Sequence, residues 1–182
     1  MLFRSAYTRD LTPTQDNNWE RAKTAGSGGG AKDFLTFIEG EVRGLINQTY
    51  NVNKYDQTLV GHSFGGLFGL YVLLTSPESF KRYVLASPSL WWDNNMIFKL
   101  EKQYAGNNTN LTRRVFLAVG SEEAGLGTKQ MVKNTRLMFD SIKRRNYAGL
   151  DIGFKVFEGE SHQSVVATSM REGIKSVFQE HR

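Results

Sequence analysis

The 182-residue sequence predicts an α/β fold, a mostly parallel sheet with helices on both faces. Short apolar runs alternate along the chain with longer segments in which apolar residues recur at helical spacing, as βαβ units require. The chain is 40% hydrophobic and long enough to bury one sizeable core. We therefore expect a single domain over residues 1–182.

The N-terminal segment is polar and shows no periodic apolar pattern. It ends in the glycine-rich stretch 26–30, which cannot hold a regular element against the entropy of its own backbone. We expect residues 1–30 to be largely loop.

The next segment, from Ala31 to about Tyr50, has the pattern of an amphipathic helix. Its apolar residues recur at spacings of three and four, and they are Phe34, Leu35, Phe37, Ile38, Val42, Leu45 and Ile46. Because an apolar helix face needs a partner surface, we expect this face to pack on a sheet.

Strands and helices then alternate. The predicted strands are the short apolar runs Thr58 to Val60, Tyr83 to Ala86, Val115 to Val119 and Gly153 to Phe157. The helical segments that follow them are Gly65 to Thr75, Asn94 to Tyr104, Lys129 to Arg145 and Ser164 to Glu180. Parallel sheets of this kind place their ligand sites at the carboxyl ends of the strands, so we search for chemistry there.

Composition excludes several classes of protein. No cysteine is present, which excludes disulfides, thiolate catalysis and cysteine-bound metals. No apolar run reaches the length of a membrane span, and the N-terminus has no apolar region of a signal peptide, so localisation is unknown with the cytoplasm as the default. The net charge of +5 is spread along the chain without a basic run interleaved with aromatic residues. We therefore expect neither nucleic acid nor a membrane as a partner.

One short motif, at residues 61–65, indicates a catalytic serine. Residues 61–65, Gly-His-Ser-Phe-Gly, follow a predicted strand and open a predicted helix, which is the setting of a G-x-S-x-G nucleophile elbow. The serine of such an elbow lies on a tight and strained turn, so its neighbours must be small, and Gly61, Gly65 and Gly66 meet that demand. We expect Ser63 to be a nucleophile. The helix that starts at Phe64 directs free N–H groups toward it, so the Phe64 amide is the expected oxyanion donor.

A serine nucleophile needs a base, and the sequence offers three histidines. His62 adjoins Ser63, where successive side chains diverge, and is interpreted as a packing or pocket residue. His181 is next to the last residue and is expected to be solvated. His162 follows the last predicted strand, in the loop where a parallel sheet presents its site, and is the expected base.

The base needs an orienting carboxylate. In sites built on a nucleophile elbow, this residue lies between the serine and the histidine in the chain. Glu123 follows the third predicted strand and is the first candidate, with its neighbour Glu122 second. Asp93, after the second strand, is a third candidate, although we interpret it as the N-cap of the helix that begins near Asn94.

Two adjacent indoles, Trp91 and Trp92, lie in the loop after the second predicted strand. They cannot both face one side, so we expect one to pack under the sheet and the other to border the cleft as a substrate pocket wall. No metal-ligand spacing appears, and the glycine stretch lacks the ending of a phosphate loop. We therefore expect no metal and no cofactor.

Five segments together resemble the Putative esterase family of α/β hydrolases, in particular its branch of siderophore-triester hydrolases. They are residues 7–14 (YTRDLTPT), 29–35 (GGAKDFL), 59–66 (LVGHSFGG), 87–92 (SPSLWW) and 159–162 (GESH). The resemblance implies that Ser63 matches the family nucleophile, that His162 matches its histidine, and that Glu123 falls where the acid follows a strand-ending glycine. It implies a small-molecule ester as substrate, cleaved through an acyl-serine intermediate.

The resemblance also implies that the first strands of the family domain, with the second oxyanion amide, precede the part that matches here. An edge of the strand Thr58 to Val60 would then be exposed. We expect either self-association through that edge or a repacked segment, Met1 to Leu11, laid across it. Two alternatives to an esterase remain open: an acyltransferase on the same scaffold, and a catalytically impaired binding domain.

Overall fold

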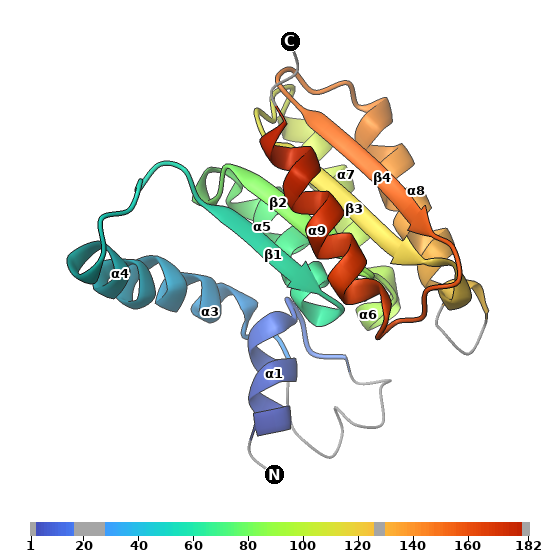
Figure 1. The fold of residues 1–182 in the computed structure, drawn as a ribbon, viewed down its shortest axis with the longest axis horizontal. Coiled ribbons are helices and arrows are strands. Elements are labelled where there is room, and N and C mark those ends of the chain that lie inside the picture. The colour runs from blue at the N-terminus through green and yellow to red at the C-terminus, as the bar shows by residue number, and fades with distance from the viewer. Residues whose placement is uncertain (1–2, 17–27, 126–129, 180–182) are drawn as a thin grey trace.

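The computed structural model of the chain describes residues 3–16, 28–125 and 130–179. Its centre is a parallel sheet with strand order β1-β2-β3-β4 (Figure 1). The strands are β1 (Thr58–His62), β2 (Arg82–Ala86), β3 (Arg114–Gly120) and β4 (Asp151–Phe157). Each strand pairs with the next in parallel register, and this arrangement confirms the predicted α/β fold.

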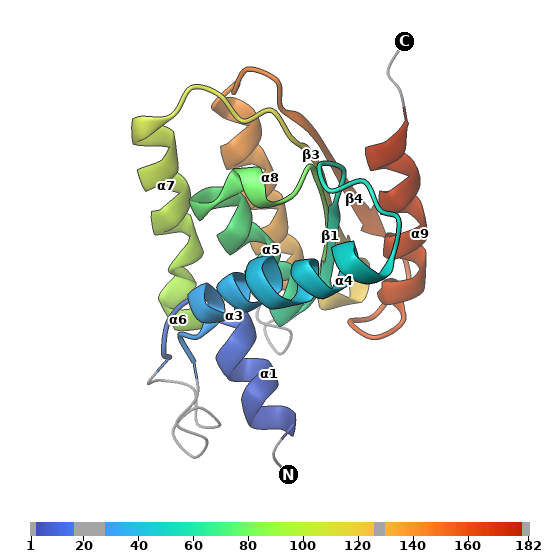
Figure 2. The same ribbon diagram turned by 90° about the vertical axis from the view of Figure 1, so that its left-hand side faces the viewer.

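Helices cover both faces of the sheet, as predicted. Their bounds are α1 (Phe3–Leu11), α3 (Ala31–Phe37), η1 (Ile38–Val42), α4 (Arg43–Thr49), α5 (Phe64–Thr75), η2 (Pro77–Ser79), α6 (Trp92–Asn95), α7 (Ile97–Asn107), η3 (Ser121–Ala124), α8 (Met131–Arg144) and α9 (Val165–Phe178). Helix α9 packs on β2, β3 and β4 from one side, while α5 and α8 pack on the opposite face and α7 packs on α5 (Figures 1 and 2).

The two central strands are apolar because both of their faces are buried. One core cluster lies between the sheet and α5, α7 and α8, and the other lies between the sheet and α9. Two glycines allow the closest approach to β2. A Cβ at Gly69 of α5 would lie 2.2 Å from Leu85 Cδ2, and a Cβ at Gly173 of α9 would lie 2.3 Å from Val84 Cγ1. These helices therefore hold β2 tightly from both sides.

The prediction that residues 1–30 are largely loop is wrong for residues 3–11, which form α1. Tertiary contacts stabilise this short helix, because it packs against α3 and α5 and the Tyr7 ring lies 5.8 Å from the Phe64 ring. The helix ends where Pro13 disfavours a helical Thr12. Residues 12–16 and 28–30 are irregular as expected, and residues 17–27 lie outside the described residues.

Helix α1 also bears on the expectation that Met1 to Leu11 lies across the edge of β1. Figures 1 and 2 show α1 beyond the carboxyl end of β1 and not along its edge. Residues 1–2 lie outside the described part of the chain. The expected repacking is therefore wrong for the described residues 3–11.

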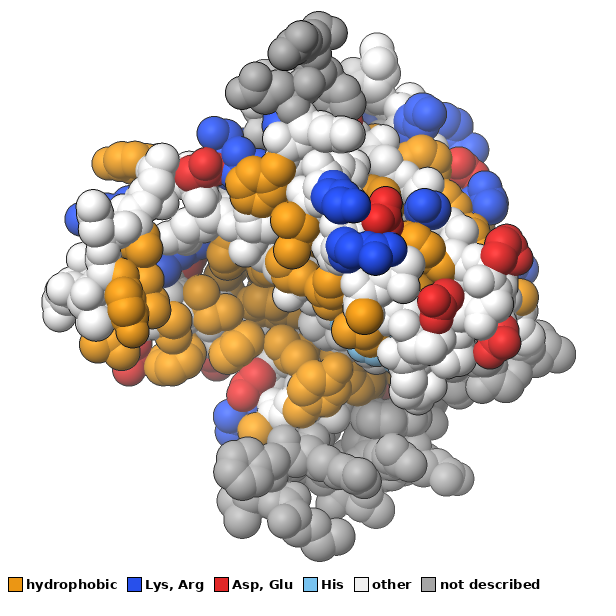
Figure 3. All heavy atoms as spheres, viewed as in Figure 1, with side chains coloured by type: hydrophobic (Ala, Val, Ile, Leu, Met, Phe, Trp, Pro, Cys, Tyr) orange, Lys and Arg blue, Asp and Glu red, His pale blue; other side chains and the backbone are white. Residues whose placement is uncertain are grey.

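The segment 31–49 is helical as predicted, with the π-helical turn η1 in its middle. The prediction that its whole apolar face packs on the sheet is wrong. Its first half reaches the core, where Leu35 is buried, the Phe34 ring lies 5.4 Å from the Phe68 ring of α5, and Ile38 of η1 packs against the core cluster. In α4, Leu45 is 65% exposed. Figure 3 shows apolar side chains gathered on both sides of the gap between this helical arm and the sheet.

No helix in the described ranges is both long enough and apolar enough to span a bilayer.

Candidate active site

Ser63 lies on the turn between β1 and α5, with φ of 59° and ψ of −118°. A positive φ is strained for a non-glycine residue and is tolerated where the surroundings impose it. Gly61 is required by this turn, because a Cβ there would lie 2.2 Å from the Gly65 carbonyl oxygen. A Cβ on Gly65 itself would meet nothing within 4 Å. The expectation that Gly65 must be small is therefore wrong, since Gly65 contributes its backbone to the crowding.

Helix α5 begins at Phe64, directly after the serine, and its first turn closes with the Leu67 N–H donating to the Ser63 carbonyl at 3.0 Å. The positive end of the helix dipole thus lies beside the Ser63 side chain. The Phe64 ring is fixed in the core, 5.1 Å from the Trp92 ring. The backbone at Phe64 is therefore rigid, as an oxyanion donor needs to be.

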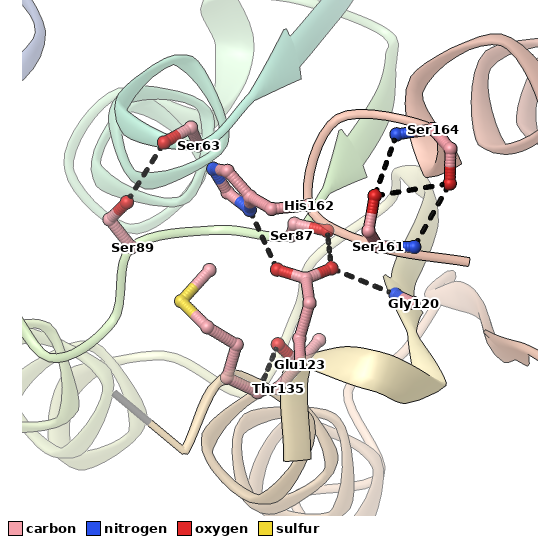
Figure 4. Close-up of polar contacts among 10 residues, drawn as sticks. Ser63, Ser87, Ser89, Gly120, Glu123, Thr135, Ser161, His162 and Ser164 are labelled. Carbon is pink, nitrogen blue, oxygen red and sulfur yellow. Dashed lines mark hydrogen bonds and ion pairs between the residues drawn. The ribbon is translucent and has the colours of Figure 1, made fainter. Parts of the chain in front are cut away.

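His162 lies in the loop between β4 and α9, as predicted. Its Nδ1 is 2.6 Å from Glu123 Oε2. Figure 4 shows the imidazole between Ser63 and Glu123, with the other ring nitrogen on the side of Ser63. The loop itself is held by Ser161 and Ser164, whose backbone N–H groups each donate to the hydroxyl of the other at 2.9 Å and 3.3 Å.

The Glu123 carboxylate is buried, with a side-chain exposure of 1%. Its Oε1 accepts hydrogen bonds from Ser87 Oγ at 2.6 Å and from the Gly120 N–H at 2.9 Å. Burial alone would raise the pKa of Glu123, but the hydrogen bonds from His162, Ser87 and Gly120 outweigh it and hold the pKa below its ordinary value. The carboxylate is therefore ionised and fixed in orientation, which suits it to fix the tautomer and plane of the imidazole.

The Ser63 hydroxyl lies 3.2 Å from Ser89 Oγ. Ser89 is buried and its backbone N–H donates to the Ser63 carbonyl at 3.1 Å. A second hydroxyl at the nucleophile gives Ser63 a resting partner on the side away from His162 (Figure 4).

His62, one of the three pocket candidates, contacts the His162 ring with a centroid distance of 4.4 Å. Its Nε2 is buried without a hydrogen-bond partner among the described residues. Burial, and then the charge of His162, lowers the pKa of His62 below its ordinary value. His62 therefore presents a neutral ring against the face of His162 and helps to fix the position of that ring.

The two indoles differ in burial. Trp92 is completely buried, and its Nε1 donates to the Thr14 carbonyl at 3.0 Å, so it belongs to the core and not to a pocket wall. Trp91 is half-buried, lies 5.9 Å from the Phe64 ring, and borders an open hollow between α6, α7 and α8.

The remaining acid and base candidates lie elsewhere. Glu122 is exposed, and its backbone N–H donates to the Glu160 carbonyl at 3.2 Å. Asp93 is in the left-handed region, with φ of 43°. The interpretation of Asp93 as an N-cap is wrong, because Trp91 and Met96 precede α6 and α7 and neither helix has a side-chain cap. His181 lies outside the described residues.

Sequence reasoning missed three residues that fix this site: Ser87, Ser89 and Gly120. All three lie at or just after the carboxyl ends of β2 and β3. Ser87 is buried with φ of 42°, a strained position for serine. The rule that parallel strands present ligands at their carboxyl ends could have identified the two serines. In the described ranges, no group of three or more His, Asp or Glu side chains is placed to hold a metal ion.

A family model described as "Putative esterase" matches residues 9–169 of the chain, a range that includes Ser63, Glu123 and His162. The chain belongs to the Putative esterase family.

Relatives of this esterase-family chain include the ferri-bacillibactin esterase of Bacillus subtilis, which is 33% identical over 179 residues. That match covers 95% of this chain and 62% of the relative. The siderophore enterobactin esterase of Emericella nidulans is 38% identical over 110 residues, covering 57% of this chain and 36% of the relative. The chain thus spans less than two thirds of the length of these relatives.

Solved structures agree with the fold. A BES protein from Bacillus cereus superposes with a TM-score of 0.84 at 32% identity, over 97% of this chain and 65% of that one. The siderophore hydrolase EstA from Aspergillus nidulans gives a TM-score of 0.81 at 27% identity, over 94% and 65% of the two chains. The parallel sheet and helices described above are therefore similar to those of the BES protein and of EstA.

Proposed function

We propose that this chain is a serine esterase that cleaves carboxylic esters, and that its substrates are siderophore esters. The observation that carries the reaction class is the 2.6 Å contact between His162 Nδ1 and Glu123 Oε2, which orients the imidazole beside Ser63. The names of the two curated relatives support the substrate class.

The first half of the reaction forms an acyl-serine. His162 Nε2 takes the proton of Ser63 Oγ as that oxygen attacks the ester carbonyl carbon. The Phe64 N–H donates to the oxyanion at the helix N-terminus. When the tetrahedral intermediate collapses, the bond to the leaving oxygen breaks and His162 returns the proton to that alkoxide.

The second half repeats these steps with water. His162 takes a proton from the water molecule that attacks the acyl-serine carbonyl, and the carboxylic acid leaves as Ser63 Oγ regains a proton. Throughout, Glu123 holds the imidazole in one tautomer and stabilises the imidazolium that forms twice. The lowered pKa of Glu123 keeps it ionised for this role.

A panel of 4-nitrophenyl esters of increasing acyl length, together with a ferric catecholate triester, tests the proposal. Ser63→Ala and His162→Ala should each lower kcat on the order of 10⁶, because the two residues act as one unit. The matched control is Ser76→Ala, since Ser76 is the residue after the opposite end of α5.

Residual activity within tenfold of wild type in either site variant would contradict the assignment. A fluorophosphonate probe should label the wild type and not Ser63→Ala, because labelling requires the activated hydroxyl. Hydrolysis of the simple esters without the triester would retain the esterase and refute the substrate class. Product release that requires added alcohol would indicate an acyltransferase instead.

A further inference from the structure

Ser89 lies beside the nucleophile, and the mechanism above gives its side chain no role. Its Oγ is 3.2 Å from Ser63 Oγ, and either hydroxyl can be the donor in this contact. Ser89 is 2% exposed. In the part of the chain that the structure describes, Ser89 Oγ makes no other hydrogen bond. The hydroxyl is therefore shielded from water and directed at one atom, the oxygen that attacks the ester.

The backbone of Ser89 is fixed to the nucleophile elbow. The Ser89 N–H donates to the Ser63 carbonyl at 3.1 Å, and the Ser89 carbonyl accepts a hydrogen bond from the Trp92 N–H at 3.2 Å. The same loop is joined to the elbow a second time, because the Ser63 N–H donates to the Ala86 carbonyl at 3.1 Å. A donor held in this way can stabilise a developing charge without a large reorganisation at the moment of reaction.

The direction of the Ser89 hydroxyl suits it to one oxygen of the tetrahedral intermediate. Figure 4 shows Ser89 and His162 on different sides of Ser63 Oγ. The leaving oxygen must face His162, because it receives its proton from that imidazole. The oxyanion is a different substituent of the same carbon and points elsewhere. The Ser89 hydroxyl is therefore placed for the oxyanion and not for the leaving oxygen.

The contact between the two hydroxyls also brings the oxyanion within reach. When Ser63 Oγ attacks, it bonds to the carbonyl carbon, its proton goes to His162, and the π-electron pair moves to the carbonyl oxygen. That oxygen and Ser63 Oγ are then bonded to one carbon, so they lie closer together than two hydrogen-bonded oxygens do. A donor that already contacts Ser63 Oγ needs only a small shift to reach the oxyanion.

The hydrogen of the Ser89 hydroxyl is available for this contact. When the Ser63 O–H is directed at His162, as the mechanism requires, Ser63 Oγ offers Ser89 only lone pairs, so Ser89 is the donor. As negative charge passes from Ser63 Oγ to the carbonyl oxygen, the same donor can follow it.

We propose that Ser89 is a catalytic residue whose hydroxyl is the second donor to the oxyanion, beside the Phe64 N–H. Oxyanion holes next to a nucleophile elbow use two donors. The hydrogen of Ser89 is shared and not transferred, so the proton balance of the mechanism is unchanged. This role rests on the proposed esterase function and adds a residue to it.

The kinetics of Ser89→Ala with 4-nitrophenyl hexanoate test the proposal. Loss of one oxyanion donor should lower kcat on the order of 10² and leave KM within about threefold, because the charge that the donor stabilises is absent in the bound substrate. Ser89→Cys preserves the shape of the side chain but has a weaker donor, so its kcat should also fall.

The matched control is Ser169→Ala. Ser169 is a buried serine of α9, and its Oγ donates to the Val166 carbonyl at 3.1 Å. This variant also loses a buried hydroxyl, but it should keep the wild-type kcat. Calorimetry on both alanine variants checks that they are folded, and their Tm values should be similar.

A trifluoromethyl ketone separates charge stabilisation from a merely structural role. Ser63 Oγ adds to the carbonyl carbon of 1,1,1-trifluoroheptan-2-one, and the former carbonyl oxygen becomes the anionic oxygen of a tetrahedral adduct. A ¹⁹F NMR titration of the adduct gives the pH at which that oxygen gains a proton. Loss of a donor should move this midpoint upward in Ser89→Ala, whereas Ser169→Ala should leave it at the wild-type value.

Three results would overturn the role of Ser89 and retain the esterase: a kcat of Ser89→Ala within about threefold of wild type, a kcat above wild type, or a lowered kcat with an unchanged adduct midpoint. A wild type that neither cleaves the ester nor forms the adduct would refute the esterase function, and the role of Ser89 with it.

Discussion

The carboxyl end of the sheet and the outer edge of β1 differ in how completely they are packed. At the carboxyl end, Glu123 is 1% exposed and its two oxygens accept hydrogen bonds from Ser87, Gly120 and His162. At the outer edge, Val60 is 42% exposed and Leu45 of the nearby helical arm is 65% exposed. The same sheet therefore has a closely packed carboxyl end, with Ser63, Glu123 and His162, and an exposed edge at β1. We call the first region the finished corner and the second the unfinished edge.

This difference in packing indicates which elements hold the catalytic residues in place. The catalytic side chains are held by the ends of β1 to β4 and by α5, and none of their hydrogen bonds involves the helical arm 31–49 among the described residues. Changes at the finished corner should therefore alter rate and pH dependence, whereas changes at the unfinished edge should alter association.

The largest effect at the finished corner, after loss of Ser63 or His162 themselves, should come from Glu123→Gln. An amide cannot stabilise the imidazolium and favours the wrong tautomer, so kcat should fall by about 10⁴. Glu122→Gln and Asp93→Asn serve as matched controls, because neither side chain contacts His162 in the described structure. If either control is the most damaging of the three in the ester assay, the acid is misassigned.

A smaller loss of rate should follow removal of the Ser87 hydroxyl, which donates to Glu123 at 2.6 Å. A lost hydrogen bond to a buried charge costs roughly 1.5 to 3 kcal/mol, so kcat/KM should fall about tenfold or more as the carboxylate loosens. Ser87→Gly and Ser87→Ala both remove the hydroxyl, but only glycine accepts the φ of 42° without strain. Wild-type activity in Ser87→Gly would show that only the backbone conformation matters there.

The free energy of unfolding should depend on pH through two residues at the finished corner, His62 and Glu123. Because burial lowers the pKa of His62 below its ordinary value of 6.5, the unfolded chain binds this proton more readily than the folded chain. Stability should therefore fall as the pH drops below about 6.5, and Glu123, whose pKa is also lowered, adds a further loss at lower pH.

His62→Phe keeps a ring against His162 and removes the titration. Between about pH 7.5 and about pH 5.5, its Tm should drop less than that of the wild type, by about 2 °C or more. Calorimetry at the two pH values measures this difference. An equal drop in both proteins would assign the pH dependence to other groups.

Much of the finished corner could be predicted from the sequence, because its signals are local. An elbow between a strand and a helix places Ser63, and a loop after the last strand places His162. Distinguishing Glu123 from Glu122 needed the turn η3, which directs residue 123 inward. Adjacent glutamates on a turn carry no sequence signal of their own, so only tertiary structure separates them.

The parts that could not be predicted depend on distant contacts. Gly61 and His62 look like turn residues, yet they extend β1 because they pair with Leu85 and Ala86. Helix α1 exists because α3 and α5 pack on it, which a polar sequence with weak periodicity does not reveal. The exposed face of α4 is the converse case, since a helical pattern predicts a partner surface and cannot place one.

Self-association tests the unfinished edge. Changes that alter it should have the smallest effect on the rate of ester cleavage. In the described structure β1 pairs with β2 alone, so its outer edge has backbone groups open to another strand. A second copy of the chain offers an identical edge and an identical apolar arm, and the two can pair about a twofold axis. We predict that the chain forms dimers whose fraction rises with concentration.

Val60→Lys and Leu45→Lys should each lower the dimer fraction measured by size-exclusion chromatography with light scattering, because a charge on an edge or an apolar patch opposes pairing. Ile174→Lys is the matched control, since Ile174 is 45% exposed but belongs to α9 and not to β1 or the helical arm. The rate per chain should stay within about twofold in all three variants, as for substitutions that remove no specific feature. A wild type that remains monomeric at every concentration, or a control that dissociates the dimer as well as Val60→Lys does, would show that the β1 edge does not mediate association.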